Sequence, residues 1–253
     1  MYSKAIILDL DGTVLHDDKT ISSKTIDVLN KCKEKNICVI VATARSEMAS
    51  KKYISQINPQ AIISNGGALV TLHDRIIYEK SLSAKNTNGI IQKCLAHKTG
   101  TITVENSDGY FRNTLEEAYT SDYEHAIYTD FTLYIKPAYK ITVDIDSLSL
   151  AQSIANEFDD CDMLTFTGEN WRRFAHKNAT KTFALDILLK KLKINLSDAV
   201  SFGDDYIDIE MIKHCGTGVA VGNAIAELKN EADYITDTNN NDGVANYISE
   251  FLL

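Results

Sequence analysis

The chain has 253 residues, of which 44% are hydrophobic and 24% are charged. These proportions are those of an ordinary globular protein and exclude the disordered and fibrous classes. The length suits one large domain or two modest ones, with a core that folds without disulfides or a structural metal. The formal net charge of −9 disfavours nucleic acid and anionic membranes as partners. A small phosphorylated molecule is compatible with that charge, because one local cationic pocket is enough to bind it.

The five cysteines are scattered, odd in number and without a C-x-x-C pair, which indicates reduced thiols in an intracellular protein. The first apolar run, residues 5–10, is short and interrupted by Asp9, so we expect neither a signal peptide nor an anchor. No apolar run approaches the ~20 residues of a membrane span. These features predict a cytoplasmic protein.

Strand and helix patterns alternate in the first part of the chain. Apolar runs rich in β-branched residues predict buried parallel strands at 5–10, 37–42 and 61–64. Helical spacing and cap residues predict helices that begin at Ser22 or Ser23 and near residue 46. A hairpin is expected at 68–72 and 75–79.

Between residues 83 and 177 the pattern changes. Predicted helices there cover 88–97 and 148–158, and predicted strands cover 101–104, 132–136, 140–145 and 163–167. Strands that are adjacent in sequence favour an antiparallel α+β unit inserted into the first domain.

The α/β order then returns. Predicted helices cover 180–192, 207–214, 224–229 and 244–253, and predicted strands cover 199–202, 218–221 and 234–235. The run Asn239–Asn241 is expected to be a polar loop. The whole pattern predicts a doubly wound, Rossmann-like parallel sheet formed by residues 1–82 and 178–253, with a second α+β domain at 83–177. Ligands are expected beyond the carboxyl ends of the parallel strands.

Asp9 and Asp11 stand at the end of the first predicted strand, in the stretch Asp9-Leu10-Asp11-Gly12-Thr13. Two carboxylates so close together repel unless a cation or a shared proton separates them. One can be an ionised nucleophile and the other a proton donor, which are the two groups that phosphoryl transfer to a carboxylate requires. The alternative is an Asp-Gly turn followed by a helix cap.

Asp204 and Asp208 follow the predicted strand at 199–202. Because the carboxyl ends of parallel strands meet at one sheet edge, we expect these side chains near Asp9 and Asp11. An oxygen-rich site of this kind suits Mg²⁺. Stabilisation by a helix dipole would also explain Asp208 in the first turn of the next predicted helix, but it would not explain Asp204.

Thr43 ends the second predicted strand, and Ala44 with Arg45 is expected to open a helix. A hydroxyl with free backbone amides there can hold a phosphate, although threonine is also an ordinary N-cap. Lys181 falls in the first turn of a predicted helix, where a cation opposes the helix dipole, so an anionic partner would explain it. A solvated surface lysine is the alternative.

In their order along the chain, these four sites resemble the motifs of the haloacid dehalogenase (HAD) superfamily of aspartate-nucleophile phosphatases. More narrowly, the chain resembles the Cof-type members, subfamily IIB, which carry a large α/β cap where this chain has residues 83–177. The resemblance covers the whole chain. It includes the stretches Ile62-Ile63-Ser64-Asn65-Gly66-Gly67, Lys181-x-x-Ala184-Leu185 and Gly218-Val219-Ala220-Val221-Gly222-Asn223-Ala224.

The resemblance implies Mg²⁺-dependent hydrolysis of a small phosphate monoester, such as a sugar phosphate, through an aspartyl-phosphate intermediate. Asp9 would attack phosphorus, and Asp11 would protonate the leaving alkoxide and then activate water. The implied phosphate-binding residues are Thr43, Ala44 and Lys181. The implied metal ligands are Asp9, Asp11 through its backbone carbonyl, Asp204 and Asp208.

The chain departs from the family pattern at two places. Ala44 replaces the usual glycine, and Ile207 replaces the usual asparagine, whose polar group would orient a metal-bound water or the phosphate. Loss of a polar group that supports a metal ligand, as at Ile207, typically reduces metal affinity or activity ~10–100-fold. Two alternatives stay open: a phosphomutase of the same subfamily, and a catalytically weakened relative that acts as a binding or regulatory module.

In the inserted domain, Arg112, Trp171 and Arg173 are candidate specificity residues, with Arg172 and His176 beside them in the sequence. Arginine binds a carboxylate or phosphate through two hydrogen bonds, and an aromatic face stacks on a ring. We therefore expect a substrate with a second anionic or strongly polar group. The alternative is that these are solvated surface residues.

Overall fold

The computed structural model describes residues 4–114, 126–165 and 170–253. The chain forms two compact units. The first, here called the core unit, comprises Met1–Arg45, Ser50–Tyr78 and Thr180–Leu253, and the second, the inserted unit, comprises Ser46–Ala49 and Glu79–Ala179.

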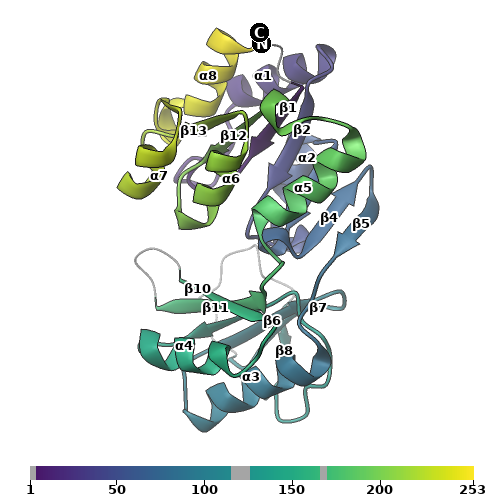
Figure 1. Cartoon of the computed structure of the whole chain (residues 1–253), viewed down its shortest axis with the longest axis vertical. Coiled ribbons are helices and arrows are strands. Elements are labelled where there is room, and N and C mark those ends of the chain that lie inside the picture. The colour runs from purple at the N-terminus through teal and green to yellow at the C-terminus, as the bar shows by residue number, and fades with distance from the viewer. Residues whose placement is uncertain (1–3, 115–125, 166–169) are drawn as a thin grey trace. The chain divides into compact units, whose positions relative to one another are not determined.

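The core unit is built on an eight-stranded sheet in the order β14-β13-β12-β1-β2-β3-β4-β5 (Figure 1). Its strands are β1 (Ala5–Leu8), β2 (Cys38–Ala42), β3 (Ala61–Ser64), β4 (Leu69–Leu72), β5 (Arg75–Glu79), β12 (Ala199–Gly203), β13 (Thr217–Ala220) and β14 (Tyr234–Ile235). All pairings from β14 to β3 are parallel, and β4 pairs with β3 in the antiparallel sense.

Helices pack on both faces of this sheet because its central strands are apolar on both sides. Ile6 and Leu8 of β1 belong to one buried cluster, with helices α1 (Ser23–Glu34) and α8 (Gly243–Phe251). Ile7 belongs to another, with helix α5 (Lys181–Leu192). Strands that alternate between two cores carry near-continuous hydrophobic runs. The predicted doubly wound α/β fold is confirmed.

Three helices and three 3₁₀ turns complete the elements considered below; the first residues of α2 belong to the inserted unit. They are α2 (Glu47–Ile57), α6 (Ile209–His214), α7 (Ala226–Glu231), η1 (Asn65–Gly67), η4 (Tyr206–Asp208) and η5 (Asn239–Asn241). The helix predicted from residue 207 thus begins at Ile209, after a separate 3₁₀ turn, so Asp208 lies before α6 and outside its first turn.

The inserted unit contains a six-stranded sheet in the order β10-β11-β9-β6-β7-β8 and helices α3 (Ala84–Ala96) and α4 (Leu148–Asn156). Its strands are β6 (Ile102–Asn106), β7 (Gly109–Arg112), β8 (Ile127–Tyr128), β9 (Lys140–Asp144), β10 (Cys161–Thr165) and β11 (Trp171–His176). The sheet is antiparallel except for the β7–β8 pair. One face packs its apolar residues with α3 and α4.

Two strand predictions in this unit need correction, and some of its strands were not predicted. The strand predicted at 132–136 is wrong: the stretch is a loop, in which Tyr134 packs edge-on against Phe131 while Leu133 is 87% exposed. Tyr134 is the one buried residue of this stretch, and ring packing buries it without a neighbouring strand. Strands β7, β8 and β11 were not among the predicted strands. The strand predicted at 163–167 begins at Cys161, and its last two residues lie outside the described residues.

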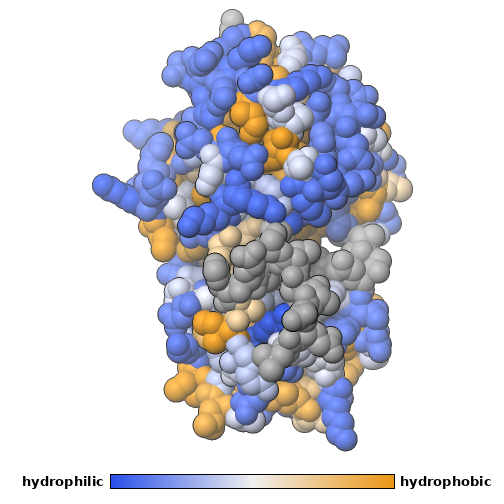
Figure 2. Space-filling model, turned by 180° about the vertical axis from the view of Figure 1, so that it is seen from behind, coloured by the Kyte–Doolittle hydropathy of each residue, from blue (hydrophilic) through white to orange (hydrophobic). Residues whose placement is uncertain are grey.

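The face of the molecule in Figure 2 is mostly hydrophilic, with apolar residues gathered in small separate patches. Scattered exposed apolar side chains are ordinary on protein surfaces. Among the described residues, none of the helices has the length and apolar character needed to cross a membrane.

Candidate active site

Two neighbouring parallel strands place the acidic residues at one edge of the core sheet. Leu8 of β1 pairs with Phe202 of β12, and the Asp9 amide donates a hydrogen bond to the Phe202 carbonyl at 3.2 Å. Asp204 follows β12 directly. The structure therefore brings the first and last acidic motifs together, as the strand order predicted.

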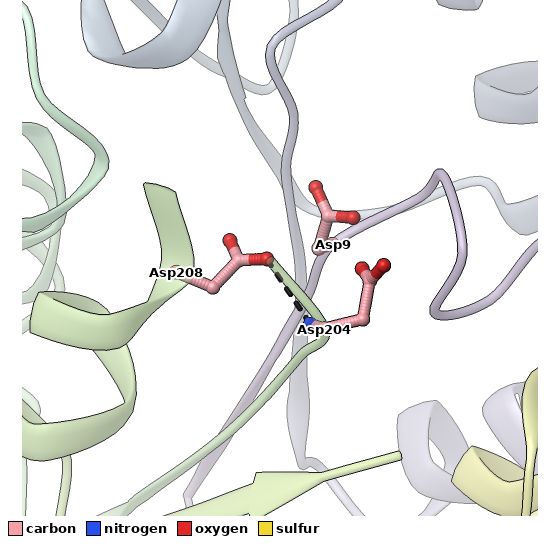
Figure 3. Close-up of side chains that lie close together, drawn as sticks. All are labelled: Asp9, Asp204 and Asp208. Carbon is pink, nitrogen blue, oxygen red and sulfur yellow. Dashed lines mark hydrogen bonds between the residues drawn. The ribbon is translucent and has the colours of Figure 1, made fainter. Parts of the chain in front are cut away.

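Asp9, Asp204 and Asp208 form a compact carboxylate group in which one oxygen from each residue lies within 4.8 Å of the other two (Figure 3). Asp9 and Asp208 are buried. Burial and the charges of Asp208 and Asp204 raise the pKa of Asp9, against the opposing effect of Lys181. Burial and the Asp208 charge raise the pKa of Asp204 to about 7. The group is short of positive charge, and hard carboxylate oxygens fit a divalent cation such as Mg²⁺.

Lys181, the first residue of α5, supplies a cation to this group. Its Nζ donates to Asp9 Oδ1 at 2.5 Å and to Asp208 Oδ1 at 2.7 Å, and its side chain is 1% exposed. Burial would lower the pKa of Lys181, but the charges of Asp208 and Asp9 outweigh it and the net pKa is raised. The sequence predicted an anionic partner for Lys181, and two carboxylates occupy that role here.

Asp208 is oriented by hydrogen bonds from the backbone. Its Oδ2 accepts from the amides of Asp204 at 3.2 Å and Asp205 at 3.4 Å (Figure 3 shows the first of these). Ile207, which stands where the family usually has asparagine, is half-buried in η4. Its side chain has no polar atom, so the orientation of Asp208 depends on the main chain and on Lys181.

The Asp11 carboxylate is bound by cations of its own. Arg45 donates from Nε to Oδ2 at 2.6 Å and from Nη2 to Oδ1 at 2.8 Å, and Lys19 Nζ donates to Oδ1 at 3.0 Å. Burial acts to raise the pKa of Asp11, but the hydrogen bonds and charges of Arg45 and Lys19 lower it to about 2. Asp11 is therefore ionised in this arrangement.

The loop that carries Thr43 and Ala44 is held by the η1 turn. The Asn65 amide donates to the Arg45 carbonyl at 2.8 Å, and the Gly66 amide donates to the Thr43 carbonyl at 2.9 Å. The Thr43 hydroxyl accepts from the Arg45 amide at 3.1 Å. Helix α2 begins only at Glu47, so the expectation that Ala44 and Arg45 open a helix is wrong. The half-buried Ala44 lies in this loop.

Two glycines allow close approaches in the site. Gly67 has a φ of +106°, and a Cβ there would lie 2.1 Å from the carbonyl oxygen of Thr180, the residue before Lys181. Gly12 has a φ of +74°, and a Cβ there would lie 2.2 Å from Asp204 Oδ2. A left-handed backbone and the lack of a side chain are both required at these positions.

The candidate specificity residues lie on the inserted unit's sheet. Arg112 pairs with Thr103, Thr103 with Thr142, and Thr142 with Arg173, so one row across four strands places both arginines on the same face. Trp171 is two residues from Arg173 and shares that face. Arg112 donates to the Thr114 hydroxyl at 2.6 Å, and Arg173 donates to the Ala179 carbonyl at 3.0 Å. Arg172, the neighbour of Arg173 in β11, points to the opposite face. His176 lies on that same opposite face, because side chains alternate along a strand.

Sequence reasoning missed several polar contacts. The Thr13 hydroxyl donates to Asp204 Oδ1 at 2.8 Å, and Lys19 contacts Asp11. On the polar face of the inserted sheet, a buried ion pair joins Lys140 to Glu105 at 2.9 Å. The alternation of polar and apolar residues along β6 and β9 carried the signal for this last pair.

A model of the haloacid dehalogenase-like hydrolase family matches residues 6–248. The chain belongs to this family. The superfamily predicted from the four motifs is thereby confirmed, and almost the whole chain takes part in the match.

Relatives of this HAD-like hydrolase are similar over nearly their full length. The 5-amino-6-(5-phospho-D-ribitylamino)uracil phosphatase YcsE of Bacillus subtilis (strain 168) is 27% identical over 255 residues, which are 99% of this chain and 96% of that protein. The HAD subclass IIB sugar phosphatase BT4131 superposes with a TM-score of 0.87 at 22% identity, over 98% of this chain and 99% of that one. The phosphatase BT1666 of Bacteroides thetaiotaomicron superposes with a TM-score of 0.86 at 22% identity, over 99% of this chain and 95% of that one. The two structural matches show a shared fold.

We predict that the metal-free hydrolase loses stability as the pH rises from about 4 to 7. The unfolded chain ionises Asp204 near the ordinary value of 3.8, whereas the folded chain keeps the proton up to about 7, so the folded state binds more protons in this interval. Asp204→Asn should flatten the decline, and Mg²⁺ should raise the melting temperature of the wild type more than that of the variant. Thermal unfolding in chelator and in Mg²⁺ measures both effects. Equal pH slopes for the two proteins would contradict the prediction.

Proposed function

We propose that this HAD-like hydrolase hydrolyses a small phosphate monoester through an aspartyl-phosphate on Asp9. The observation that carries the proposal is the contact of the buried Asp9 carboxylate with Lys181 at 2.5 Å, at the edge of the sheet where Asp204 and Asp208 converge. A carboxylate nucleophile beside a fixed cation suits phosphoryl transfer, which depends mainly on positioning and on neutralising oxygen charge. The phosphatase names of the relatives support the same reaction.

In the first half-reaction, an Asp9 oxygen attacks phosphorus and the bond from phosphorus to the leaving oxygen breaks. Lys181 and the Thr43 loop bind the phosphoryl oxygens, and Asp11 gives its proton to the departing alkoxide. Because Arg45 and Lys19 hold Asp11 ionised in the structure, the acid form requires that substrate binding weakens their hold, so that the carboxylate takes up a proton from solvent before the transfer.

In the second half-reaction, Asp11 is already in the form it needs. Its carboxylate takes a proton from a water molecule, whose oxygen attacks the phosphorus of the aspartyl-phosphate. The bond from phosphorus to Asp9 breaks, inorganic phosphate leaves, and Asp9 is restored as a free carboxylate. The strong hold of Arg45 on Asp11 favours this base form.

The carboxylate group fits Mg²⁺, which we propose as the cofactor. Asp9, Asp204 and the backbone carbonyl of Asp11 would hold it, with Asp208 beside them. When bound, the metal supplies positive charge that stabilises the phosphoryl oxygens. The raised pKa of Asp9 and of Asp204 in the metal-free site supports this assignment, because a divalent cation would relieve the repulsion that raises them.

The inserted unit, which we equate with the predicted cap at 83–177, is proposed to bind the part of the substrate beyond the phosphate. Arg112, Trp171 and Arg173 share one polar sheet face with the Lys140–Glu105 pair. Such a face suits a leaving group with several polar atoms and a ring. Our proposed location is the cytoplasm, since all five cysteines are free thiols.

Asp9→Asn should abolish turnover of 4-nitrophenyl phosphate, because an amide cannot attack phosphorus, and it should leave the melting temperature close to that of the wild type.

Chelator should likewise abolish wild-type activity, and Mg²⁺ should restore it. Released phosphate measures both. Substantial turnover by a well-folded Asp9→Asn variant would contradict the nucleophile assignment. A wild type inactive at every metal concentration would favour the binding-module alternative.

A phosphatase panel of phosphorylated metabolites, which includes the 5-amino-6-(5-phospho-D-ribitylamino)uracil named for YcsE, tests the role of the cap. With the best substrate found, Arg173→Met should raise KM ~10-fold, as expected for the loss of a charge-assisted contact. Its KM for 4-nitrophenyl phosphate should stay nearly unchanged. Arg172→Met, on the opposite face of the same strand, is the matched control. Equal losses on both substrates would show that Arg173 acts through the stability of the inserted unit.

A further inference from the structure

The segment from Gly12 to Lys19 follows Asp11 directly in the chain and has little regular structure of its own. Three successive amides, of Thr13, Val14 and Leu15, donate to the carbonyl of Leu10. Leu15 forms an isolated β-bridge with Asp11. The position of the Asp11 main chain therefore depends on how this segment is held.

Asn239, which the sequence assigned to a plain polar loop, holds the segment from the other end of the chain. It is 3% exposed. Its Nδ2 donates to the Leu15 carbonyl at 2.9 Å and to Asp17 Oδ1 at 3.0 Å. A buried amide with both donor hydrogens directed at fixed acceptors restrains those acceptors strongly, because an unmade buried hydrogen bond is costly.

A second asparagine extends the same connection to the residue after Asp11. The backbone N–H of Asn239 donates to Asn223 Oδ1 at 2.9 Å, and Asn223 Nδ2 donates to the Gly12 carbonyl at 2.7 Å. The main chain on both sides of the Asp11–Leu15 bridge is thus attached to the η5 turn. No residue of η5 belongs to the acidic motifs, so this attachment is separate from the carboxylate group.

We propose that Asn239 is a positioning residue for the proton transfer of Asp11: it holds the Gly12–Asp17 segment so that the Asp11 carboxylate meets the leaving oxygen of the substrate. The inference rests on the proposed function. It predicts a larger loss of kcat/KM for an ester whose leaving oxygen needs a proton, since Asp9 and Lys181 are positioned by other elements.

The test compares two asparagines of the same 3₁₀ turn. Asn239→Asp keeps the shape of the side chain but replaces both donor hydrogens by an acceptor that faces the Leu15 carbonyl and the Asp17 carboxylate. Asn241→Asp makes the same change of charge at an exposed position. Each variant is assayed on phenyl phosphate, whose leaving phenol is as weakly acidic as tyrosine (pKa ~10), and on 4-nitrophenyl phosphate, whose leaving group is more acidic and needs less help from a proton donor.

We expect Asn239→Asp to lower kcat/KM on phenyl phosphate by ~10-fold or more and on 4-nitrophenyl phosphate by less than ~3-fold, as for a weakened general acid. Asn241→Asp should match the wild type on both esters. Equal losses on the two esters, or no loss beyond that of Asn241→Asp, would overturn the inference.

Asn223→Ala provides a second measurement if Asn239→Asp does not fold, because it removes the bond to the Gly12 carbonyl from an exposed side chain. The same preferential loss on phenyl phosphate is expected, and an unchanged ratio between the esters would overturn the inference. A wild type inactive on both esters would overturn the proposed function and this inference together. An active wild type with unchanged ratios in the variants would overturn only the role of Asn239.

Discussion

The contact of the Lys181 ammonium with the buried carboxylates of Asp9 and Asp208 is the interaction on which the rest of the site depends. Burial and the repulsion of neighbouring carboxylates penalise the charged forms of Asp9 and Asp204 and raise the pKa of each. One buried lysine keeps part of the group ionised, and the raised pKa of Asp204 shows that one cation is not enough. Removing the lysine would leave buried carboxylates without a cation, a change that typically costs ~3–5 kcal/mol.

The parallel sheet brings the acidic residues of this site together. Asp9 and Asp204 are far apart in the chain and share one site because the ends of their strands meet, since β1 and β12 are direct neighbours. The η1 turn then connects two further pieces, because its amides hold the Thr43 loop while Gly67 lies against the residue before Lys181. A side chain at Gly67 would separate these elements, so the turn is as necessary to the site as the charged residues are.

Asp11 shows how one carboxylate can be prepared for two opposite tasks. Arg45 and Lys19 keep it ionised, which suits a base, and the segment after it is attached to the η5 turn by Asn239 and Asn223. The contacts of Arg45 and Lys19 keep the Asp11 carboxylate ionised, and the contacts of Asn239 and Asn223 fix the position of the main chain that follows it.

The sequence by itself determined the fold class, the family and the acidic residues, because buried parallel strands are long apolar runs and a carboxylate at the end of such a run has few structural explanations. It did not predict β11 or the loop at 132–136, where the order of polar and apolar residues is compatible with more than one local structure. It also treated Asn239 as part of a loop, since a single asparagine in a polar run carries no signal of burial. Only the tertiary structure decided that Asn239 contacts the first loop of the chain, that Arg45 and Lys19 take the Asp11 carboxylate, and that Arg112 and Arg173 share a sheet face. Apart from Lys19, which is close to Asp11 in sequence, these residues are distant along the chain, and the packing of the elements alone sets their distance in space.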